Sequence, residues 1–440
     1  MIKVVKFGGS SLASAEQFRK VKDIILSDPD RRFVVPSAPG KRDSSDTKVT
    51  DMLYQCYAIA EQGGDFTDAL AKIRERYQEI IDGLSLTVSL ESEFAVIREN
   101  FAAKAGRDYA ASRGEYLNGI LLANYLGFEF LDSARYIRFL PDGTYDAAAT
   151  QELLSKGLSG LSNAVIPGFY GAYADGRVKT FSRGGSDITG SIVARAVHAN
   201  LYENWTDVSG FLVADPRIVK NPKVIETITY RELRELSYMG AGVLHEDAIF
   251  PVRTAGIPIN IKNTNAPEDE GTFIVENTSR KPAFVITGIA GKKGFTAINI
   301  EKDMMNTEIG FGRKALQAFE DNGISFEHMP SGIDTLSVFV HQHEFEEKEQ
   351  AILAEIHKLC NPDFIDISTD LALIAVVGRG MKSNHGTAAK IFRGLDNAGV
   401  NLRMIDQGSS ELNIIIGVAS KDFETAVNAI YQAFVPKDAE

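Results

Sequence analysis

Residues 6–11 read Lys-Phe-Gly-Gly-Ser-Ser and could bind a phosphate group. Paired glycines let backbone N–H groups approach an anion closely, and a helix that starts after them adds a partial positive charge. Lys6 can place an ammonium group on the same anion. The turn lacks the third glycine of the dinucleotide-binding pattern and the Gly-Lys-Ser/Thr ending of the Walker pattern. Taken alone, this stretch is therefore equally compatible with an ordinary strand-to-helix turn.

A second Gly-Gly turn, in residues 180–189 (Thr-Phe-Ser-Arg-Gly-Gly-Ser-Asp-Ile-Thr), carries groups suited to an amino acid. Arg183 precedes the glycines and can bind a carboxylate through two hydrogen bonds. Asp187 lies at the predicted helix start and can accept hydrogen bonds from an ammonium group. The two side chains match the two ends of an amino acid. The alternative is a capped helix with a surface ion pair, because Ser and Asp are common at helix starts.

A third motif, Asn-Trp-Thr-Asp-Val-Ser-Gly at residues 204–210, is followed by Ala-Asp-Pro-Arg at 214–217. Thr206 and Asp207 lie at the C-terminal end of a predicted strand, where parallel sheets bind ligands, and could hold a nucleotide base or ribose. Arg217 could reach the phosphates. The alternative is a plain β-turn at the Asp-Pro pair.

Alternating strands and helices are predicted to position these motifs. Apolar runs bounded by turn residues predict strands at residues 2–5, 32–37, 164–169, 200–206 and 257–262. Helical spacing predicts helices at residues 50–61, 66–81, 92–103, 116–126 and 187–198, and a first helix with Phe18, Val21 and Ile25 on its buried side. This alternation predicts an α/β fold with a mainly parallel sheet between helices.

An internal repeat follows the polar segment 276–282. At an offset of 76 residues, matching glycines occur at 310 and 386, 323 and 399, and 332 and 408, with apolar matches between them. Each copy predicts helix, turn, strand, turn and strand, so the C-terminal part is interpreted as a duplicated α+β module. The strands at 334–340 and 410–416 would leave sheet edges open in a monomer, which predicts at least a dimer formed through residues 283–440.

The composition narrows the class of protein. The chain has 440 residues, 44% of them hydrophobic, and a net charge of −12, which argues against nucleic acid or an anionic membrane as the main partner. Cys56 and Cys360 lie far apart without a partner motif and are interpreted as buried thiols. Without a membrane-length apolar run or a signal-peptide pattern, a cytoplasmic protein is expected.

The ordered set of motifs resembles that of the aspartokinases over the whole chain. The three stretches above resemble the family's opening Lys-Phe-Gly-Gly-Thr-Ser and its two later signatures. Val-Pro-Ser-Ala-Pro-Gly at 35–40, Lys-Val-Thr-Asp-Met-Leu at 48–53 and Arg-Gly-Glu at 113–115 resemble its substrate motifs. Val-Val-Gly-Arg-Gly-Met at 376–381 and Gln-Gly-Ser-Ser-Glu-Leu-Asn at 407–413 resemble the second of its regulatory ACT modules.

This resemblance implies an amino-acid-kinase fold followed by two ferredoxin-like ACT modules. The implied boundaries are a catalytic domain at 1–278, a linker and shared first strand at 279–294, and modules at 295–368 and 369–440. The implied reaction is ATP- and Mg²⁺-dependent phosphorylation of the β-carboxylate of L-aspartate to 4-phospho-L-aspartate, the first step of lysine, threonine and methionine biosynthesis. A homodimer or homotetramer under feedback control by an amino acid is implied as well.

Roles for individual residues follow from the same resemblance. Lys6 and Asp187 are implied as catalytic, with Lys6 neutralising the phosphates during transfer. The implied nucleotide-binding residues are Lys6, Phe7, Gly8, Gly9, Ser10, Thr206, Asp207, Leu212 and Arg217. The implied aspartate-binding residues are Ser37 and Thr50 for the reacting carboxylate, Arg183 for the α-carboxylate, and Glu115, Ser186 and Asp187 for the amino end.

Two departures from the family pattern bear on nucleotide affinity. Gly242 replaces a lysine that contacts ATP phosphate, and Leu212 replaces an aromatic residue. Neither touches Lys6, Arg183 or Asp187, so the activity is retained as the prediction. The alternatives are a kinase for a different carboxylate and a non-catalytic amino-acid sensor with a degenerate kinase domain.

The effector site is predicted in the loop 302–310, Lys-Asp-Met-Met-Asn-Thr-Glu-Ile-Gly. Its backbone groups could hold the α-carboxylate and amine of an effector amino acid, and the predicted site residues in the loop are Met304, Met305, Asn306 and Ile309. Glu327, on the following strand, could accept a side-chain ammonium group, which favours lysine over threonine. The alternative for this loop is an exposed acidic surface.

Overall fold

The computed structural model describes residues 1–182, 184–241, 244, 246–280 and 282–435. The chain divides into two compact units. The N-terminal unit comprises Met1–Phe211, Val224–Tyr230 and the described part of 243–278. The C-terminal unit comprises Leu212–Lys223 and the described parts of 231–242 and 279–440. Among the described helices, none combines the length and apolarity needed to cross a membrane.

An eight-stranded sheet forms the centre of the N-terminal unit, in the order β3-β5-β2-β1-β8-β10-β11-β9. Its strands are β1 (Lys3–Phe7), β2 (Arg31–Pro36), β3 (Glu129–Phe130), β5 (Ala164–Val165), β8 (Leu201–Thr206), β9 (Thr227–Thr229), β10 (Ile259–Asn263) and β11 (Thr272–Val275). Every neighbouring pair is parallel except β10 with β11. This confirms the predicted, mainly parallel sheet. It also brings the C-terminal ends of β2, β1 and β8 to one edge.

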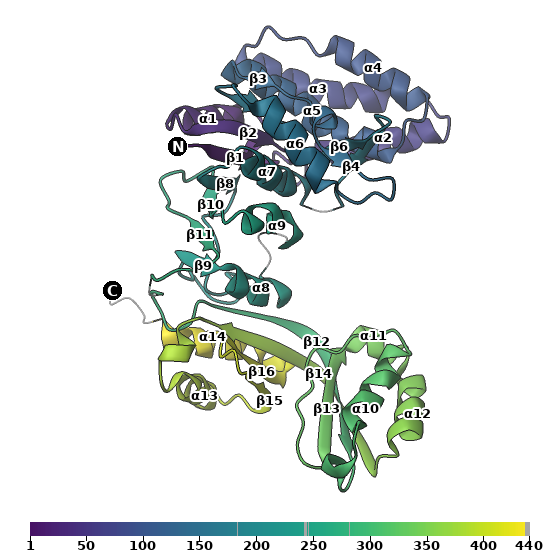
Figure 1. The fold of residues 1–440 in the computed structure, drawn as a ribbon, viewed down its shortest axis with the longest axis vertical. Helices are drawn as coiled ribbons and strands as arrows, with labels where there is room; N and C mark the ends of the chain where they lie inside the picture. The colour runs from purple at the N-terminus through teal and green to yellow at the C-terminus, as the bar shows by residue number, and fades with distance from the viewer. Residues whose placement is uncertain (183, 242–243, 245, 281, 436–440) are drawn as a thin grey trace. The chain divides into compact units, whose positions relative to one another are not determined.

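Helices flank this sheet, with a smaller sheet in the order β4-β6-β7 beside it (Figure 1). The helices are α1 (Ala15–Leu26), α2 (Val49–Glu61), α3 (Thr67–Leu84), α4 (Glu91–Ala102), α5 (Arg107–Leu126), α6 (Ala147–Leu158), α7 (Gly185–Ala196) and α9 (Glu246–Thr254). The small sheet contains β4 (Arg138–Phe139), β6 (Tyr170–Tyr173) and β7 (Val178–Thr180). Phe18, Val21 and Ile25 lie on the buried side of α1, as their spacing predicts.

Two predicted elements differ from the observed ones. The strand predicted at 164–169 is limited to β5, because Pro167 lacks the N–H that a continuing ladder needs. The helix predicted at 116–126 begins already at Arg107. Its first turns carry small residues rather than an apolar stripe, and they pack closely: a Cβ on Gly114 would lie 2.8 Å from that of Ala38. Periodicity alone does not reveal such a helix start.

The C-terminal unit contains a five-stranded sheet in the order β13-β12-β14-β16-β15. Its strands are β12 (Gly288–Glu301), β13 (Thr335–His341), β14 (Phe364–Val377), β15 (Leu402–Asp406) and β16 (Asn413–Ala419). Its helices are α8 (Tyr230–Tyr238, from residue 231 on), α10 (Phe311–Glu320), α11 (Gln342–Glu346), α12 (Glu349–Cys360), α13 (Thr387–Asn397) and α14 (Phe423–Phe434).

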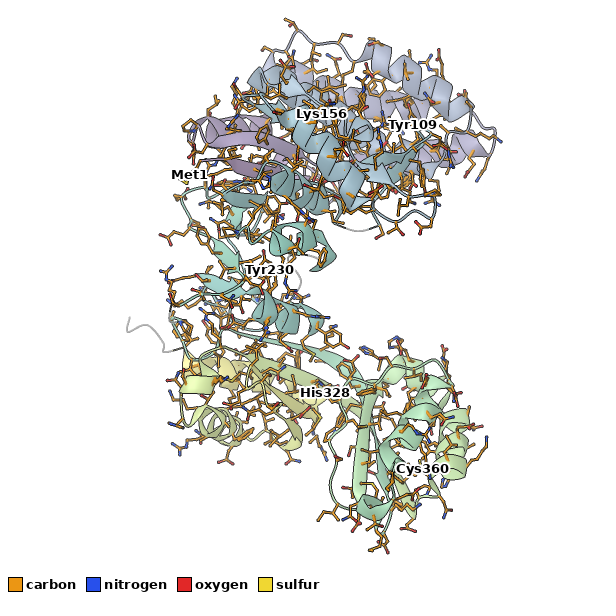
Figure 2. All side chains as sticks on the ribbon, in the orientation of Figure 1. Met1, Tyr109, Lys156, Tyr230, His328 and Cys360 are labelled. Carbon is orange, nitrogen blue, oxygen red and sulfur yellow. The ribbon has the colours of Figure 1, made fainter. Side chains whose placement is uncertain are left out.

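The internal repeat is visible in this unit. The 3₁₀ helix at Met305–Thr307 and α10 recur 76 residues later as the 3₁₀ helix at Met381–Ser383 and α13. Figure 1 shows β12 and β14 running from the helices of one copy to those of the other, so both copies share one sheet. Figure 2 shows His328 at this junction, where its Nδ1 lies 3.1 Å from a carboxylate oxygen of Asp406.

The first copy departs from the predicted pattern. Between α10 and β13 its described residues form no regular strand; isolated bridges pair His328 with Phe339 and Ser331 with Leu336 instead. Pro330 and Gly332 interrupt this segment, which explains the loss of a regular ladder. Of the two strands predicted to leave open sheet edges, β13 lies at the edge of the sheet, where the 328–331 segment partly covers it, whereas β16 lies between β14 and β15.

Candidate active site

The turn after β1 forms an anion cradle at the C-terminal edge of the sheet. The N–H of Gly8 donates to the carbonyl of Trp205 at 2.9 Å, whereas among the described residues no partner faces the N–H groups of Gly9 and Ser10. A 3₁₀ helix at Ser10–Leu12 follows, and α1 begins only after Ser14, which caps it. Two free N–H groups beside a helical turn are suited to phosphate oxygens.

Glycine is required at two positions for this cradle to form. The N–H of Gly40, in the loop after β2, donates to the carbonyl of Gly9 at 2.8 Å. A Cβ on Gly40 would lie 2.6 Å from the carbonyl carbon of Gly9, and a Cβ on Gly9 would lie 2.9 Å from the carbonyl oxygen of Ala38. Both contacts are with backbone atoms, so a side chain at either position would push the two loops apart. Phe7, the residue before the turn, stacks on Trp205 with 5.9 Å between the ring centroids.

Lys6 and Asp187 meet beside this cradle. The Lys6 ammonium group lies 2.6 Å from Oδ1 of Asp187, which comes from the first turn of α7. Nζ of Lys6 is also 3.7 Å from the position of a Cβ on Gly8, so the positive charge lies next to the turn. The structure thus brings together the two residues predicted to be catalytic. Asn204, which was not predicted, completes the cluster by contacting both side chains.

The predicted nucleotide residues divide between the two units. Thr206 and Asp207 follow β8 at the edge that holds the cradle, where the Thr206 carbonyl accepts from the N–H of Thr264 at 2.8 Å. Thr264 in turn shares a 2.7 Å hydrogen bond with the hydroxyl of Ser11. Leu212 and Arg217 belong to the C-terminal unit, and the exposed Arg217 guanidinium pairs with Asp215 at 2.6 Å. Gly242 lies outside the described residues.

The predicted aspartate residues lie around the loop after β2. Helix α5 binds this loop twice: Glu115 Oε1 accepts from the N–H of Ala38 at 3.1 Å, and Asn118 donates to the carbonyl of Ser37 at 2.6 Å. Thr50 lies in the first turn of α2, at the far end of the same loop. Asn118 was not predicted, because its contact depends on how α5 packs on β2. Sequence alone places it merely one turn after Glu115.

Helix α7 supplies the remaining predicted groups. Ser186 lies in its first turn, beside Asp187, and is buried. A Cβ on Gly168 would lie 2.5 Å from the Ser186 hydroxyl, so the 167–169 segment packs directly on this helix start. Arg183, predicted to bind the α-carboxylate, lies outside the described residues.

Glu115 is the most strongly perturbed carboxyl group of the site. Burial raises its pKa to about 8, an effect only partly opposed by the hydrogen bond from Ala38. Its Oε2 is buried and has no hydrogen-bond partner among the described groups. A buried acceptor without a donor is costly, and an ammonium group would satisfy it. This supports the predicted role of Glu115 at the amino end of the substrate.

Replacing Glu115 with glutamine is expected to change how stability depends on pH. An acid whose pKa is raised in the folded state keeps its proton while the unfolded chain loses it, so the wild type loses stability as the pH rises from about 4.5 to about 8. The glutamine variant lacks this loss. The difference in melting temperature, variant minus wild type, should therefore be larger at pH 9 than at pH 5. Each kcal/mol of difference corresponds to roughly 2–4 °C.

Thermal unfolding of both proteins at the two pH values measures this difference. Glu99→Gln, on the exposed face of α4, is the matched control and should show the same pH dependence as the wild type. Parallel pH dependence of the Glu115→Gln variant and the wild type would contradict the raised pKa.

Comparison with known proteins identifies the family. The amino acid kinase family model matches residues 1–263, and an ACT domain model matches residues 374–434. Aspartokinase 3 of Bacillus subtilis is 40% identical, over 98% of each chain. The chain belongs to the aspartokinases.

Solved aspartokinase structures agree with this assignment. The Clostridium acetobutylicum aspartate kinase is 54% identical, with a TM-score of 0.90 over 99% of this chain and 100% of that one. Escherichia coli aspartokinase III is 26% identical, with a TM-score of 0.72 over 98% of this chain and 99% of that one. The latter has been solved with aspartate and ADP, and also with lysine and aspartate. The predicted family and fold class are therefore confirmed.

Proposed function

We propose that this aspartokinase transfers the γ-phosphoryl group of ATP to the β-carboxylate of L-aspartate, forming 4-phospho-L-aspartate and ADP. In biosynthesis, this is the first step toward lysine, threonine and methionine. The observation that carries the proposal is the 2.6 Å contact between Lys6 and Asp187 beside the two free N–H groups of the cradle. The E. coli relative, which binds aspartate and ADP, supports the same substrates here.

The site performs this reaction by positioning and by neutralising charge. A β-carboxylate oxygen of aspartate attacks the γ-phosphorus while the bond to the bridging oxygen of ADP breaks, so no covalent intermediate with the protein is required. The N–H groups of Gly9 and Ser10 bind phosphate oxygens, and Lys6 balances the negative charge that develops during transfer. Ser37 and Thr50 orient the attacking carboxylate, and Glu115 holds the amino group.

Mg²⁺ is expected to reach the site bound to the phosphates of ATP. Proteins commonly bind this ion through one or two carboxylates together with substrate phosphates. The donor set fits this mode, because the described residues contain no cluster of three acidic, histidine or cysteine ligands, while Asp187 and Asp207 offer single carboxylates. Bound Mg²⁺ would neutralise phosphate charge. The side chains named above would bind and orient the two substrates.

A hydroxamate assay tests the proposal directly. Acyl phosphates react with hydroxylamine, so incubation with ATP, Mg²⁺ and L-aspartate should give aspartyl hydroxamate together with stoichiometric ADP. Glutamate and succinate serve as controls, and preference for either would indicate a kinase for a different carboxylate. Binding of aspartate without any turnover would instead identify a non-catalytic amino-acid sensor.

We also propose lysine as the effector, bound near loop 302–310. Ile309 and Met304 of this loop are exposed, as is Asn306, whereas Met305 is buried. The negative charge of this loop is partly neutralised, because the Glu308 carboxylate pairs with the ammonium groups of Lys302 and Lys314, each at 2.6 Å. The lysine complex of the E. coli relative supports the choice of effector.

Glu327 already has protein partners in this structure. Its carboxylate lies 3.2 Å from Nε2 of His341. Burial, followed by interaction with the Glu327 carboxylate, raises the pKa of Tyr238 to about 12. An effector ammonium group would therefore replace these contacts, which links effector binding to α8 through Tyr238.

Lysine is expected to inhibit the kinase at millimolar concentration or below, and Glu327→Ala should weaken this inhibition by at least about tenfold, the cost of losing one charge-assisted hydrogen bond. By linkage, inhibition that lowers aspartate affinity must weaken as the aspartate concentration is raised.

Lysine, threonine and methionine are titrated separately against wild type, Glu327→Ala and the exposed control Glu320→Ala. Insensitivity of the wild type to lysine would refute the effector. Unchanged inhibition of Glu327→Ala would refute the role of that residue.

We further propose that the C-terminal unit mediates self-association. Its exposed large apolar side chains support this, because contact with a second copy would bury them. They include Met304, Ile309, Ile333, Phe364 and, on the edge strand β15, Ile405. Light scattering at assay concentration should give a dimer or tetramer mass, and a monomer mass would refute the proposal.

A further inference from the structure

Asn204 lies between the two side chains at the centre of the site. Strands β1 and β8 are parallel neighbours, and their register pairs Lys6 with Asn204. Directly paired residues project from the same face of a sheet. The Asn204 side chain is thereby brought to Lys6 at 3.3 Å, and its amide nitrogen lies 2.8 Å from Oδ1 of Asp187. Asn204 is only 3% exposed, so water does not compete with these contacts.

We propose that Asn204 is a positioning residue for phosphoryl transfer, holding the Lys6 ammonium group and the Asp187 carboxylate in one fixed arrangement. The inference rests on the proposed kinase function. It assigns Asn204 no contact with substrate. Its effect on catalysis passes through Lys6, which faces the phosphate cradle.

The chemistry of the carboxamide fits this role in one orientation only. Its oxygen faces the ammonium group, which can only donate, and its NH₂ group faces the carboxylate, which can only accept. Reversing the amide would place donor against donor and acceptor against acceptor. Among the protein side chains, only asparagine and glutamine carry an acceptor and a donor side by side in this way. An aspartate would keep the contact to Lys6 but set a second carboxylate against Asp187.

Counting hydrogen-bond donors shows how this arrangement serves the reaction. A lysine ammonium group has three N–H donors. Asp187 and Asn204 each take one in the described structure, which leaves the third for a phosphate oxygen at the cradle. With Asp187 as its sole partner, the ammonium group could swing about that one contact. A displacement of about 1 Å at a reacting group can cost on the order of 100-fold in rate.

The same sheet contains a control for a merely structural role. Asn260, on β10, is also buried and is paired in register with Glu203, the neighbour of Asn204 in sequence. Successive residues of a strand face opposite sides, so Asn260 lies on the face away from Lys6. Its Oδ1 has no hydrogen-bond partner among the described groups. Replacing Asn260 therefore tests the loss of a buried amide from this sheet without touching the cluster.

Asn204→Ala is expected to lower kcat by about 100-fold while KM for aspartate and for ATP stays within about threefold, because the lost interaction serves transfer rather than binding. Asn260→Ala should keep wild-type kcat. In a Lys6→Ala background, Asn204→Ala should lower kcat by less than about threefold further, because a residue that acts through Lys6 has nothing left to position. Equal effects of Asn204→Ala in both backgrounds, or a kcat close to wild type, would overturn the proposal.

Asn204→Asp provides a second test should the alanine variant fail to fold. It has nearly the same shape but loses the donor to Asp187, so kcat should fall at least tenfold; a wild-type kcat would refute the proposal.

Urea unfolding midpoints of wild type, Lys6→Ala, Asn204→Ala and the double variant test the contact between Asn204 and Lys6 without relying on kinase activity. An inactive wild type would refute only the kinase function. Additive midpoint shifts would refute the coupling between Asn204 and Lys6.

Discussion

Lys6→Ala is expected to reduce kcat by about 1000-fold, the upper range for removing one donor from a site that stabilises developing charge. The ammonium group is nearly buried beside the cradle, with 10% of the side chain exposed, so water cannot replace it efficiently. KM for aspartate should change little, because the predicted aspartate ligands lie on α2, α5, α7 and the loop after β2. Initial rates of ADP and hydroxamate formation at varied aspartate and ATP separate kcat from KM.

The matched control for this prediction is Lys3→Ala. Lys3 lies on the same strand and also forms a 2.6 Å ion pair, with Asp28, but at the opposite end of β1 from the cradle. That variant should retain nearly full kcat. Near-normal turnover of Lys6→Ala in a folded protein would mean that the turn after β1 does not bind the transferred phosphate.

The local parts of the site could be predicted from the sequence. Each Gly-Gly pair precedes a helical turn, but the first pair follows β1 of the large sheet and the second follows β7 of the small sheet, so strand order alone does not predict that the two turns meet. Lys6 and Asp187 are far apart in sequence, yet both were predicted as catalytic because each belongs to its own recognisable motif. The structure places their charged groups 2.6 Å apart.

Residues outside such motifs were missed for a physical reason. Asn204 acts through the register between β1 and β8, and Asn118 acts through the packing of α5 on the loop after β2. A one-residue shift in register would turn Asn204 to the other face of the sheet. Neither register nor helix packing is encoded by a short pattern, so the two asparagines resemble any buried polar residue until the fold is known.

The division into units shows a second limit of sequence patterns. Residues 231–241 precede the last strands of the N-terminal unit, yet they belong to the C-terminal unit. Helix α8 carries Glu232, which is fully buried and binds Arg379 at 2.9 Å. Nothing in the sequence around either residue signals this pair. A buried ion pair is recognised only when both partners have been placed in the fold.

Glu232→Ala is expected to destabilise the C-terminal unit by roughly 3–5 kcal/mol, the range for removing one partner of a buried ion pair. The Glu232 carboxylate accepts from the Arg379 guanidinium, from the Arg379 N–H at 2.9 Å and from the Thr287 hydroxyl at 2.5 Å. Its removal leaves these donors facing a cavity, and Arg379 is only 17% exposed, so solvent cannot fully compensate. Helix α8 would then lose its polar contacts with Thr287, the residue before β12, and with Arg379 in the segment after β14.

Urea unfolding followed by two probes can locate this loss. Trp205, the single tryptophan, is buried in the N-terminal unit, so its fluorescence reports on that unit, whereas far-ultraviolet circular dichroism reports on both. In Glu232→Ala the dichroism change should begin at lower urea than the fluorescence change. Glu424→Ala is the control, because Glu424 pairs with Lys293 at 2.6 Å with both side chains about half exposed; its loss should cost about 1 kcal/mol or less. Similar effects of the two substitutions would show that burial does not set the strength of the Glu232–Arg379 pair.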